Sequence, residues 1–84
     1  MFLCVTDVEF LKDYQLRLTF SDGAVKEADL EGELYGEVFE PLKDKELFRQ
    51  VAVNPETNTV EWANGADFAP EFLYEIGEEV ERVA

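Results

Sequence analysis

The stretch YQLRLTF, residues 14–20, decides how the rest of the chain can fold. From Tyr14 to Phe20 every second residue is apolar, and the residues between them are polar. Successive side chains of a strand point to opposite faces, so this period of two gathers the apolar groups on one face. The stretch therefore predicts a strand with one face in a core and the other toward solvent.

The segments that flank this strand supply two neighbours for it. Residues 4–11 alternate in the same way, and the polar pair at 12–13 is short enough for a hairpin connection. On the other side, residues 21–23 (SDG) form a turn in which Gly23 can adopt a positive φ without strain. Residues 24–30 then return as a third strand, which predicts an antiparallel sheet.

The middle of the chain predicts a loop followed by a helical turn. Gly32 and Gly36 interrupt any regular element between residues 30 and 40. Near residues 42–48 the pattern favours a short helical turn. Asp44 is its expected N-cap, because an Asp side chain accepts hydrogen bonds from the free N–H groups of a first turn.

A second hairpin follows in the sequence. Residues 51–53 and 60–62 alternate on either side of the turn NPETN at 54–58. The chain thus predicts about five short antiparallel strands, arranged as two hairpins plus the returning third strand. Such strands combined with separate helical segments are typical of the α+β class.

The last third of the chain predicts one helix. The pair Asn-Gly at 64–65 turns the chain, and Pro70 fits the first position of a helix near residues 70–76. Residues 77–84 are either an acidic tail or an extension of that helix. The chain has 84 residues and no evident linker or repeat, so we expect a single α+β domain at residues 1–76.

The charge of the chain is strongly negative, which narrows the choice of partners. Twenty Asp and Glu residues against seven Lys and Arg residues give a net charge of −13. Nucleic acids are bound through Lys and Arg contacts to phosphate, so we expect no direct nucleic-acid contact. We expect no membrane binding for the same electrostatic reason. The acidity serves solubility, the binding of a basic protein or the binding of a cation.

The residue types exclude several classes of site. The chain contains no His, so it lacks the imidazole of many zinc and haem sites and of Ser/His or Cys/His couples. Its single Cys4 cannot form an internal disulfide, and the opening MFLCVTDVEF lacks a secretory signal. No apolar run approaches the roughly 20 residues of a membrane span. We therefore expect a cytoplasmic protein, and no cofactor, because so small a core leaves little room for one.

One acidic loop has the spacing of a metal site but lacks its other features. Residues 29–40 (DLEGELYGEVFE) place carboxylates as an EF-hand calcium loop does. Leu34 stands where that loop needs glycine for its sharp turn. We expect a solvated acidic loop and no dedicated metal site.

The residues most typical of a binding site lie in the stretch WANGADF at 62–68. Asn64 and Gly65 form a turn that can expose backbone N–H groups, and Asp67 lies between Trp62 and a further aromatic residue. The same pattern fits a structural loop in which Asp67 accepts backbone hydrogen bonds and Trp62 belongs to the core. Additional aromatic candidates for partner contacts are Tyr35, Phe39 and Tyr74.

Three segments together resemble the bacterial domain-of-unknown-function family 2442: FSDG at 20–23, VFEPLKDKELFRQV at 38–51 and TVEWANGADFAPEFLYE at 59–75. The resemblance extends from about residue 5 to residue 75. It implies a small α+β domain that stands alone or, in some relatives, precedes a helix-turn-helix DNA-binding domain. It also implies pairing with a second small protein encoded nearby, as in toxin–antitoxin systems, and no catalytic residues.

These observations lead to three hypotheses of different classes. The first is a noncatalytic protein-interaction module, antitoxin-like, whose acidic surface binds a small basic protein. The alternative is a small-ligand or cation-binding domain that uses the loop around Asp67 and Trp62. The third is an enzyme with a carboxylate site, which the scarcity of cationic groups disfavours. Exposed strand edges and many aromatic residues leave a homodimer open as well.

Overall fold

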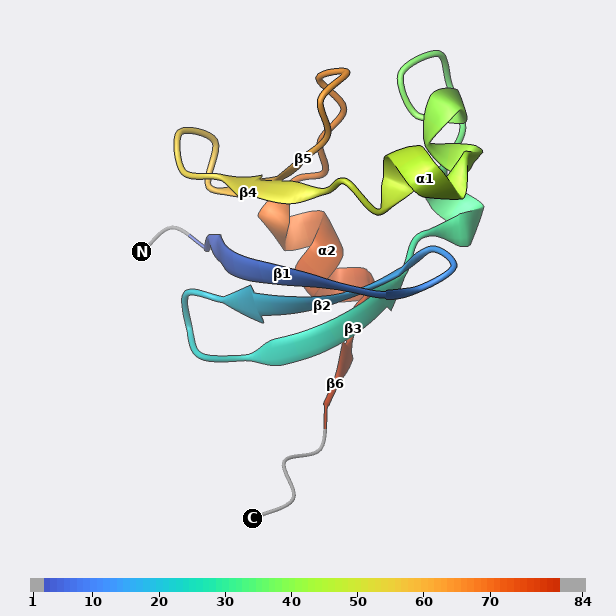
Figure 1. The fold of residues 1–84 in the computed structure, drawn as a ribbon. Coiled ribbons are helices and arrows are strands. Elements are labelled where there is room, and N and C mark those ends of the chain that lie inside the picture. The colour runs from blue at the N-terminus through green and yellow to red at the C-terminus, as the bar shows by residue number, and fades with distance from the viewer. Residues whose placement is uncertain (1–2, 81–84) are drawn as a thin grey trace.

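The alternating stretch forms β2 (Gln15–Phe20), an inner strand of a four-stranded antiparallel sheet in the computed structural model, which describes residues 3–80 (Figure 1). Its apolar residues Leu16, Leu18 and Phe20 are buried, and the polar residues between them are half-buried. β1 (Val5–Lys12) pairs with one side of β2 and β3 (Val25–Asp29) with the other. The three predicted strands and their antiparallel pairing are confirmed.

The turns between these strands use backbone conformations that their sequences favour. Asp13 has a φ of 49° in the turn from β1 to β2, and Gly23 has a φ of 91° before β3. Asp and Gly are among the residues that adopt a positive φ at the lowest cost. In the second turn the Asp22 carboxylate accepts the Ala24 N–H at 2.9 Å, which stabilises the turn.

The predicted second hairpin is a separate two-stranded sheet made of β4 (Ala52–Asn54) and β5 (Thr59–Glu61). In its turn Asn58 has a φ of 62°, and the Asn58 carbonyl accepts the Val5 N–H at 2.9 Å. Both strands of the hairpin also contact β1. This hydrogen bond and these contacts fix the small sheet beside the edge of the large one.

The helical segments are short, and their ends agree with the capping residues in the sequence. They are η1 (Glu31–Glu33), η2 (Glu40–Lys43), α1 (Lys45–Phe48) and α2 (Pro70–Ile76). Asp44 caps α1, since its carboxylate accepts the Glu46 N–H at 2.9 Å, and Pro70 opens α2. The α+β class is confirmed. No helix within residues 3–80 has the length and apolar character needed to cross a membrane.

The chain after α2 differs from both alternatives predicted for residues 77–84. The helix ends at Ile76, and β6 (Glu78–Glu79) pairs antiparallel with β3 as a sixth short strand. The outer edge of β3 offers free backbone N–H and C=O groups, and these groups bind the passing chain whatever its side chains are. Residues 81–84 lie outside the described part of the chain.

Gly77 makes this path possible because it leaves room. Its φ of −72° and ψ of 146° are accessible to any residue, so backbone conformation does not require glycine here. A Cβ atom at this position would lie 2.9 Å from the Leu73 carbonyl oxygen and 2.9 Å from Lys26 Cβ. The glycine therefore lets the chain pass closely from the end of α2 onto β3.

The core is joined through Phe48, the last residue of α1, which is fully buried. Its ring centroid lies 6.2 Å from that of Phe10, 5.3 Å from that of Tyr14 and 5.5 Å from that of Trp62. The Phe48 carbonyl oxygen accepts a hydrogen bond from Trp62 Nε1 at 2.8 Å. Phe48 thus connects the large sheet, on one side, with the chain that leaves β5 on the other.

We predict that Phe48→Ala lowers the free energy of unfolding by about 3–5 kcal/mol, because it empties a site that the backbone cannot close. Leu47→Ala, in the same short helix, is the matched control, since Leu47 is 43% exposed. For that variant we expect a loss of about 1 kcal/mol or less. Urea unfolding followed by tryptophan fluorescence measures both, and equal losses in the two variants would contradict the central role of Phe48.

Candidate functional site

The exposed apolar side chains gather around one loop. In the described residues three large hydrophobic side chains are exposed: Tyr35 at 68%, Val38 at 47% and Leu47 at 43%. All three flank the stretch WANGADF at 62–68, called here the WANGADF loop. Exposed apolar groups that cluster on a small domain mark a contact surface more often than scattered ones do.

The WANGADF loop is held in place by its own backbone and by Asn64. The Gly65 N–H donates to the Trp62 carbonyl at 2.9 Å, and Gly65 has a φ of 89°. The Asn64 side chain accepts the Ala66 N–H at 3.1 Å through Oδ1 and donates to the Val38 carbonyl at 2.9 Å through Nδ2. Asn64 therefore organises its own loop and fastens the loop around Val38 to it.

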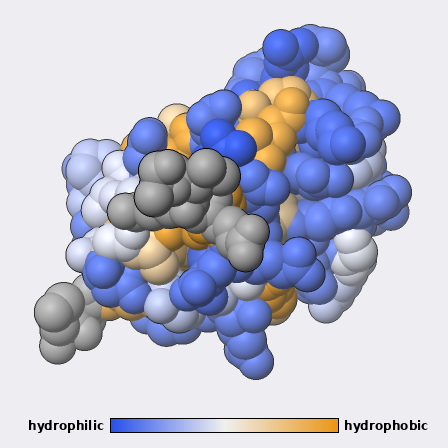
Figure 2. All heavy atoms as spheres, turned by 90° about the horizontal axis from the view of Figure 1, so that it is seen from below, coloured by the Kyte–Doolittle hydropathy of each residue, from blue (hydrophilic) through white to orange (hydrophobic). Residues whose placement is uncertain are grey.

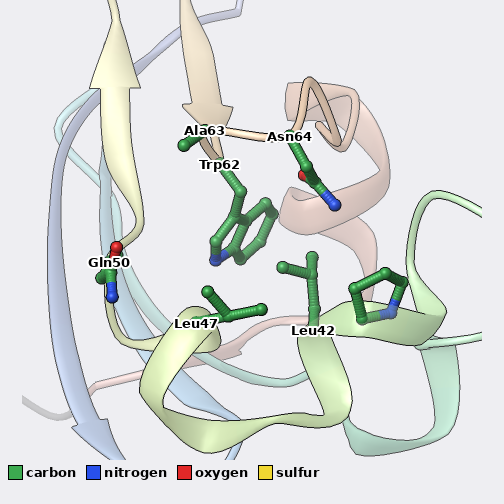
Figure 3. A pocket seen from close by; sticks show the side chains of 7 residues that line it. Leu42, Leu47, Gln50, Trp62, Ala63 and Asn64 are labelled. Atoms are coloured by element: carbon green, nitrogen blue, oxygen red, sulfur yellow. The ribbon is translucent and has the colours of Figure 1, made fainter.

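On one side of the WANGADF loop lies an apolar pocket of about 120 Å³. Leu42 and Leu47 point toward the Trp62 indole from the helical segments η2 and α1 (Figure 3). Trp62 is itself only 2% exposed, so its ring forms the inner wall of the pocket and belongs to the core. The remaining residues of the lining are Pro41, Gln50, Ala63 and Asn64.

On the other side lies a more open hollow of about 280 Å³, called here the aromatic groove. The rings of Phe39 and Phe68 stack with centroids 4.7 Å apart and an interplanar angle of 29°. Phe72 stacks on Phe68 in turn, at 5.6 Å and 15°. The other residues of the lining are Glu33, Tyr35, Asp67 and Ala69.

The two carboxylates of the aromatic groove have no cationic partner within the described residues. Five ion pairs occur there, and none of them includes Glu33 or Asp67. Asp67 is exposed, and its backbone forms an isolated bridge with Glu61.

Figure 2 shows another face, seen from below, on which hydrophilic residues surround smaller apolar areas.

The remaining aromatic candidate, Tyr74, lies apart from the pocket and the groove. Its hydroxyl donates to the Asp22 carboxylate at 2.8 Å, and the Lys26 ammonium lies 3.7 Å from its ring centroid. Lys26 Nζ also donates to the Tyr74 carbonyl at 2.8 Å. These contacts fasten α2 to β3 and to the turn before it, so Tyr74 serves the fold.

The structure therefore divides the predicted site residues among three places. Trp62 and Asn64 line the apolar pocket, Gly65 shapes the loop between the two hollows, and Tyr35, Phe39 and Asp67 line the aromatic groove. Tyr74 belongs to neither hollow. The sequence suggested Asp67 as the residue that organises the loop. In the structure Asn64 does so, because its side-chain amide bonds both the Ala66 N–H and the Val38 carbonyl.

Several residues that line these hollows were not among the predicted site residues. Phe72 lines the aromatic groove, and Leu47 lines the apolar pocket. Phe68 lies before the N-cap of α2 and Phe72 lies within the helix, so helical periodicity does not relate the two rings. Their stacking arises only in the folded chain, as does the position of Glu33, which comes from a distant segment.

The two hollows are similar in the character of their linings. Apolar and aromatic surface dominates each lining, and the polar groups are two amides in the pocket and two carboxylates in the groove. Within residues 3–80, no group of three or more Cys, Asp or Glu side chains is placed to hold a metal ion. Aromatic rings beside carboxylates favour a cationic or amphipathic ligand.

Comparisons with known proteins agree with the resemblance read from the sequence. The family described as "Protein of unknown function (DUF2442)" matches residues 5–79. The chain is also similar to the crystal structure of a protein from Nitrosomonas europaea, named "Putative DNA Binding Protein", with 32% identity and a TM-score of 0.78. The similarity covers 90% of this chain and 49% of that one, so the chain spans about half of that protein. No curated protein matches the chain.

We predict that the two hydrogen bonds of Asn64 can be separated by substitution. Asn64→Asp keeps the acceptor for the Ala66 N–H and removes the donor to the Val38 carbonyl, whereas Asn64→Ala removes both. Each lost bond should lower the free energy of unfolding by about 0.5–1.5 kcal/mol. Both variants should raise the backbone mobility of residues 35–39 in 15N relaxation, and only Asn64→Ala should speed hydrogen exchange at Ala66. Unchanged mobility at 35–39 in both variants would contradict the fastening role.

We predict a second, pH-dependent effect at Asp22. The Ala24 N–H and then the Tyr74 hydroxyl hold the pKa of Asp22 below its ordinary value of 3.8, and the hydrogen bond to Asp22 raises the pKa of Tyr74 above 10.0. Because folding lowers the pKa of Asp22, its stabilising contribution is present above pH 3.8 and is lost as the pH falls through the lowered pKa.

Tyr74→Phe tests this prediction by NMR titration of the Asp22 carboxyl carbon. The pKa of Asp22 should rise but stay below its ordinary value, since the larger contribution from the Ala24 N–H remains. Tyr14→Phe, which removes a hydroxyl that donates to the Lys43 carbonyl, is the control and should leave the pKa of Asp22 unchanged. An unchanged pKa of Asp22 in Tyr74→Phe would show that the hydroxyl does not contribute.

Proposed function

The chain belongs to the DUF2442 family of proteins of unknown function, and from that membership we propose that it is a noncatalytic protein-interaction module that binds a basic protein. The proposed surface, called here the binding face, consists of the WANGADF loop with its apolar pocket and aromatic groove. The family resemblance suggests a small protein encoded nearby, in an antitoxin-like pair, and the charge of the chain suggests that this partner is basic. The tagged protein itself is then the bait that can identify it.

The observation that carries this proposal is the position of the exposed apolar side chains. Tyr35, Val38 and Leu47 come from different segments, yet all three flank the WANGADF loop. Interfaces of protein partners combine an apolar centre with a polar rim, and aromatic residues are enriched there. The binding face has both features, because the carboxylates of Glu33 and Asp67 border its aromatic surface.

The charge of the chain supports a basic protein as partner. A net charge of −13 attracts a cationic surface from a distance and raises the rate of association at low salt. The same charge repels the phosphates of nucleic acid. The DNA binding in the name of the Nitrosomonas europaea protein refers to a chain about twice as long, of which this chain covers 49%. We assign to this chain contact with a protein and no direct contact with DNA.

A small ligand is the second candidate function, and the apolar pocket is the place where it would bind. Its volume of about 120 Å³ lies well below the roughly 300–1,000 Å³ of drug-sized ligand sites. A single aliphatic side chain of a partner fits such a hollow better than a metabolite does. The second candidate therefore requires a very small apolar molecule, which the same experiment can reveal.

We predict that Val38→Ser/Leu47→Ser weakens capture of the partner about tenfold or more, because interface energy concentrates in a few apolar contacts. The test is a pull-down with the tagged protein from its native host at low and moderate salt, read by mass spectrometry. Both substituted side chains are nearly half exposed, so the variant should fold. Leu11→Ser, on a half-buried position of β1, is the matched control.

The outcomes of this experiment are distinct. One stoichiometric basic protein, retained by the wild type and by Leu11→Ser, lost by the double variant and weakened by salt, would support the proposal. Equal capture by all three proteins would contradict the binding face. Recovery of nucleic acid, of a small molecule, or of the chain itself as a homodimer, without a basic protein, would overturn the proposed function.

A further inference from the structure

We propose that the aromatic groove is the receptor for an arginine side chain of the partner, an inference that rests on the proposed function and names the chemistry its partner must present. The groove combines two features that suit the binding of an arginine side chain. It offers exposed aromatic surface for a planar cation, and it offers two carboxylates that no described residue neutralises.

The aromatic surface is continuous and accessible. Phe39, Phe68 and Phe72 form a stack whose ring centroids lie 4.7 and 5.6 Å apart, and Tyr35 stands beside it with 68% of its surface exposed. Phe68 is itself 9% exposed, so the outer rings of the stack present most of the free surface. A cation placed over such rings is attracted by their negative faces.

The charge of the groove is not balanced from within the described chain. Arg17, Lys43, Lys45 and Arg49 each form an ion pair with a carboxylate outside the groove. Lys26 is held over Tyr74 and bonds its carbonyl oxygen. Glu33 and Asp67 therefore remain as negative groups beside apolar surface, where an arriving cation gains both contacts at once.

Arginine fits this combination better than lysine or a metal ion does. Its guanidinium is planar, stacks on aromatic rings, and donates two parallel hydrogen bonds to a carboxylate. A lysine ammonium is more strongly hydrated and cannot stack. A hard cation such as calcium needs six or more oxygen ligands, and two carboxylates among aromatic rings do not supply them.

The test titrates the 15N-labelled full chain with N-acetyl-arginine amide, and separately with N-acetyl-citrulline amide and N-acetyl-lysine amide. Citrulline has the shape of arginine without its charge. We expect saturable shifts at Tyr35, Asp67 and Phe72 with arginine, about tenfold tighter binding than with citrulline, and weaker binding with lysine. Absence of saturable shifts with arginine, or equal binding of arginine and citrulline, would overturn the inference.

Substitution of the carboxylates provides the control. Glu33→Gln/Asp67→Asn should abolish saturable arginine binding, whereas Glu56→Gln/Glu75→Gln removes the same charge from exposed positions elsewhere and should leave the binding unchanged. Equal loss of arginine binding in both double variants would show that only net charge matters, and it would contradict the groove as the arginine site.

If the pull-down captures a basic partner equally with wild type and Glu33→Gln/Asp67→Asn, the inference fails and the proposed function stands. If arginine binds the groove but no basic partner is captured, the proposed function fails alone.

Discussion

The packing of Phe48 against Trp62 is the constraint on which the rest of the structure depends. The Trp62 indole donates its N–H to the Phe48 carbonyl, so two buried polar groups satisfy each other inside an aromatic cluster. Without this bond, each group would be left in the core at a cost of about 1–3 kcal/mol. Because Phe48 also contacts Phe10 and Tyr14, a single side chain ties the large sheet to the loop that follows β5. A domain of this size has a small core, so the loss of one such contact removes a large share of its stability.

The same cluster extends outward to the surface and supports the proposed binding face. Trp62 lies 5.9 Å from Phe68 in an edge-to-face arrangement, and Phe68 stacks between Phe39 and Phe72. The outer rings are therefore supported by buried ones and need little further ordering when a partner arrives. A preorganised surface keeps more of its contact energy as affinity. The short WANGADF loop, fixed by Asn64, contributes residues to the lining of both hollows.

The charges of the described residues are paired unevenly over the molecule. The described basic residues are largely engaged by carboxylates or by Tyr74, and these exposed ion pairs contribute little to stability. Their effect is instead to leave the acidic groups of the aromatic groove unbalanced. In the Nitrosomonas europaea protein, the similar domain makes up about half of a longer chain.

The sequence alone determined the elements whose signals are local. The alternation of residues 14–20 predicted the central strand, and Asp44 and Pro70 marked the helix starts, because periodicity and capping depend on neighbouring residues. Only the tertiary structure decided that residues 78–79 form a strand, since the edge of β3 supplies their hydrogen bonds. It also brought the distant Glu33 into the same hollow as Asp67, which sequence spacing could not reveal. The hollows arise where segments far apart in the chain meet, and their chemistry therefore appears only after folding.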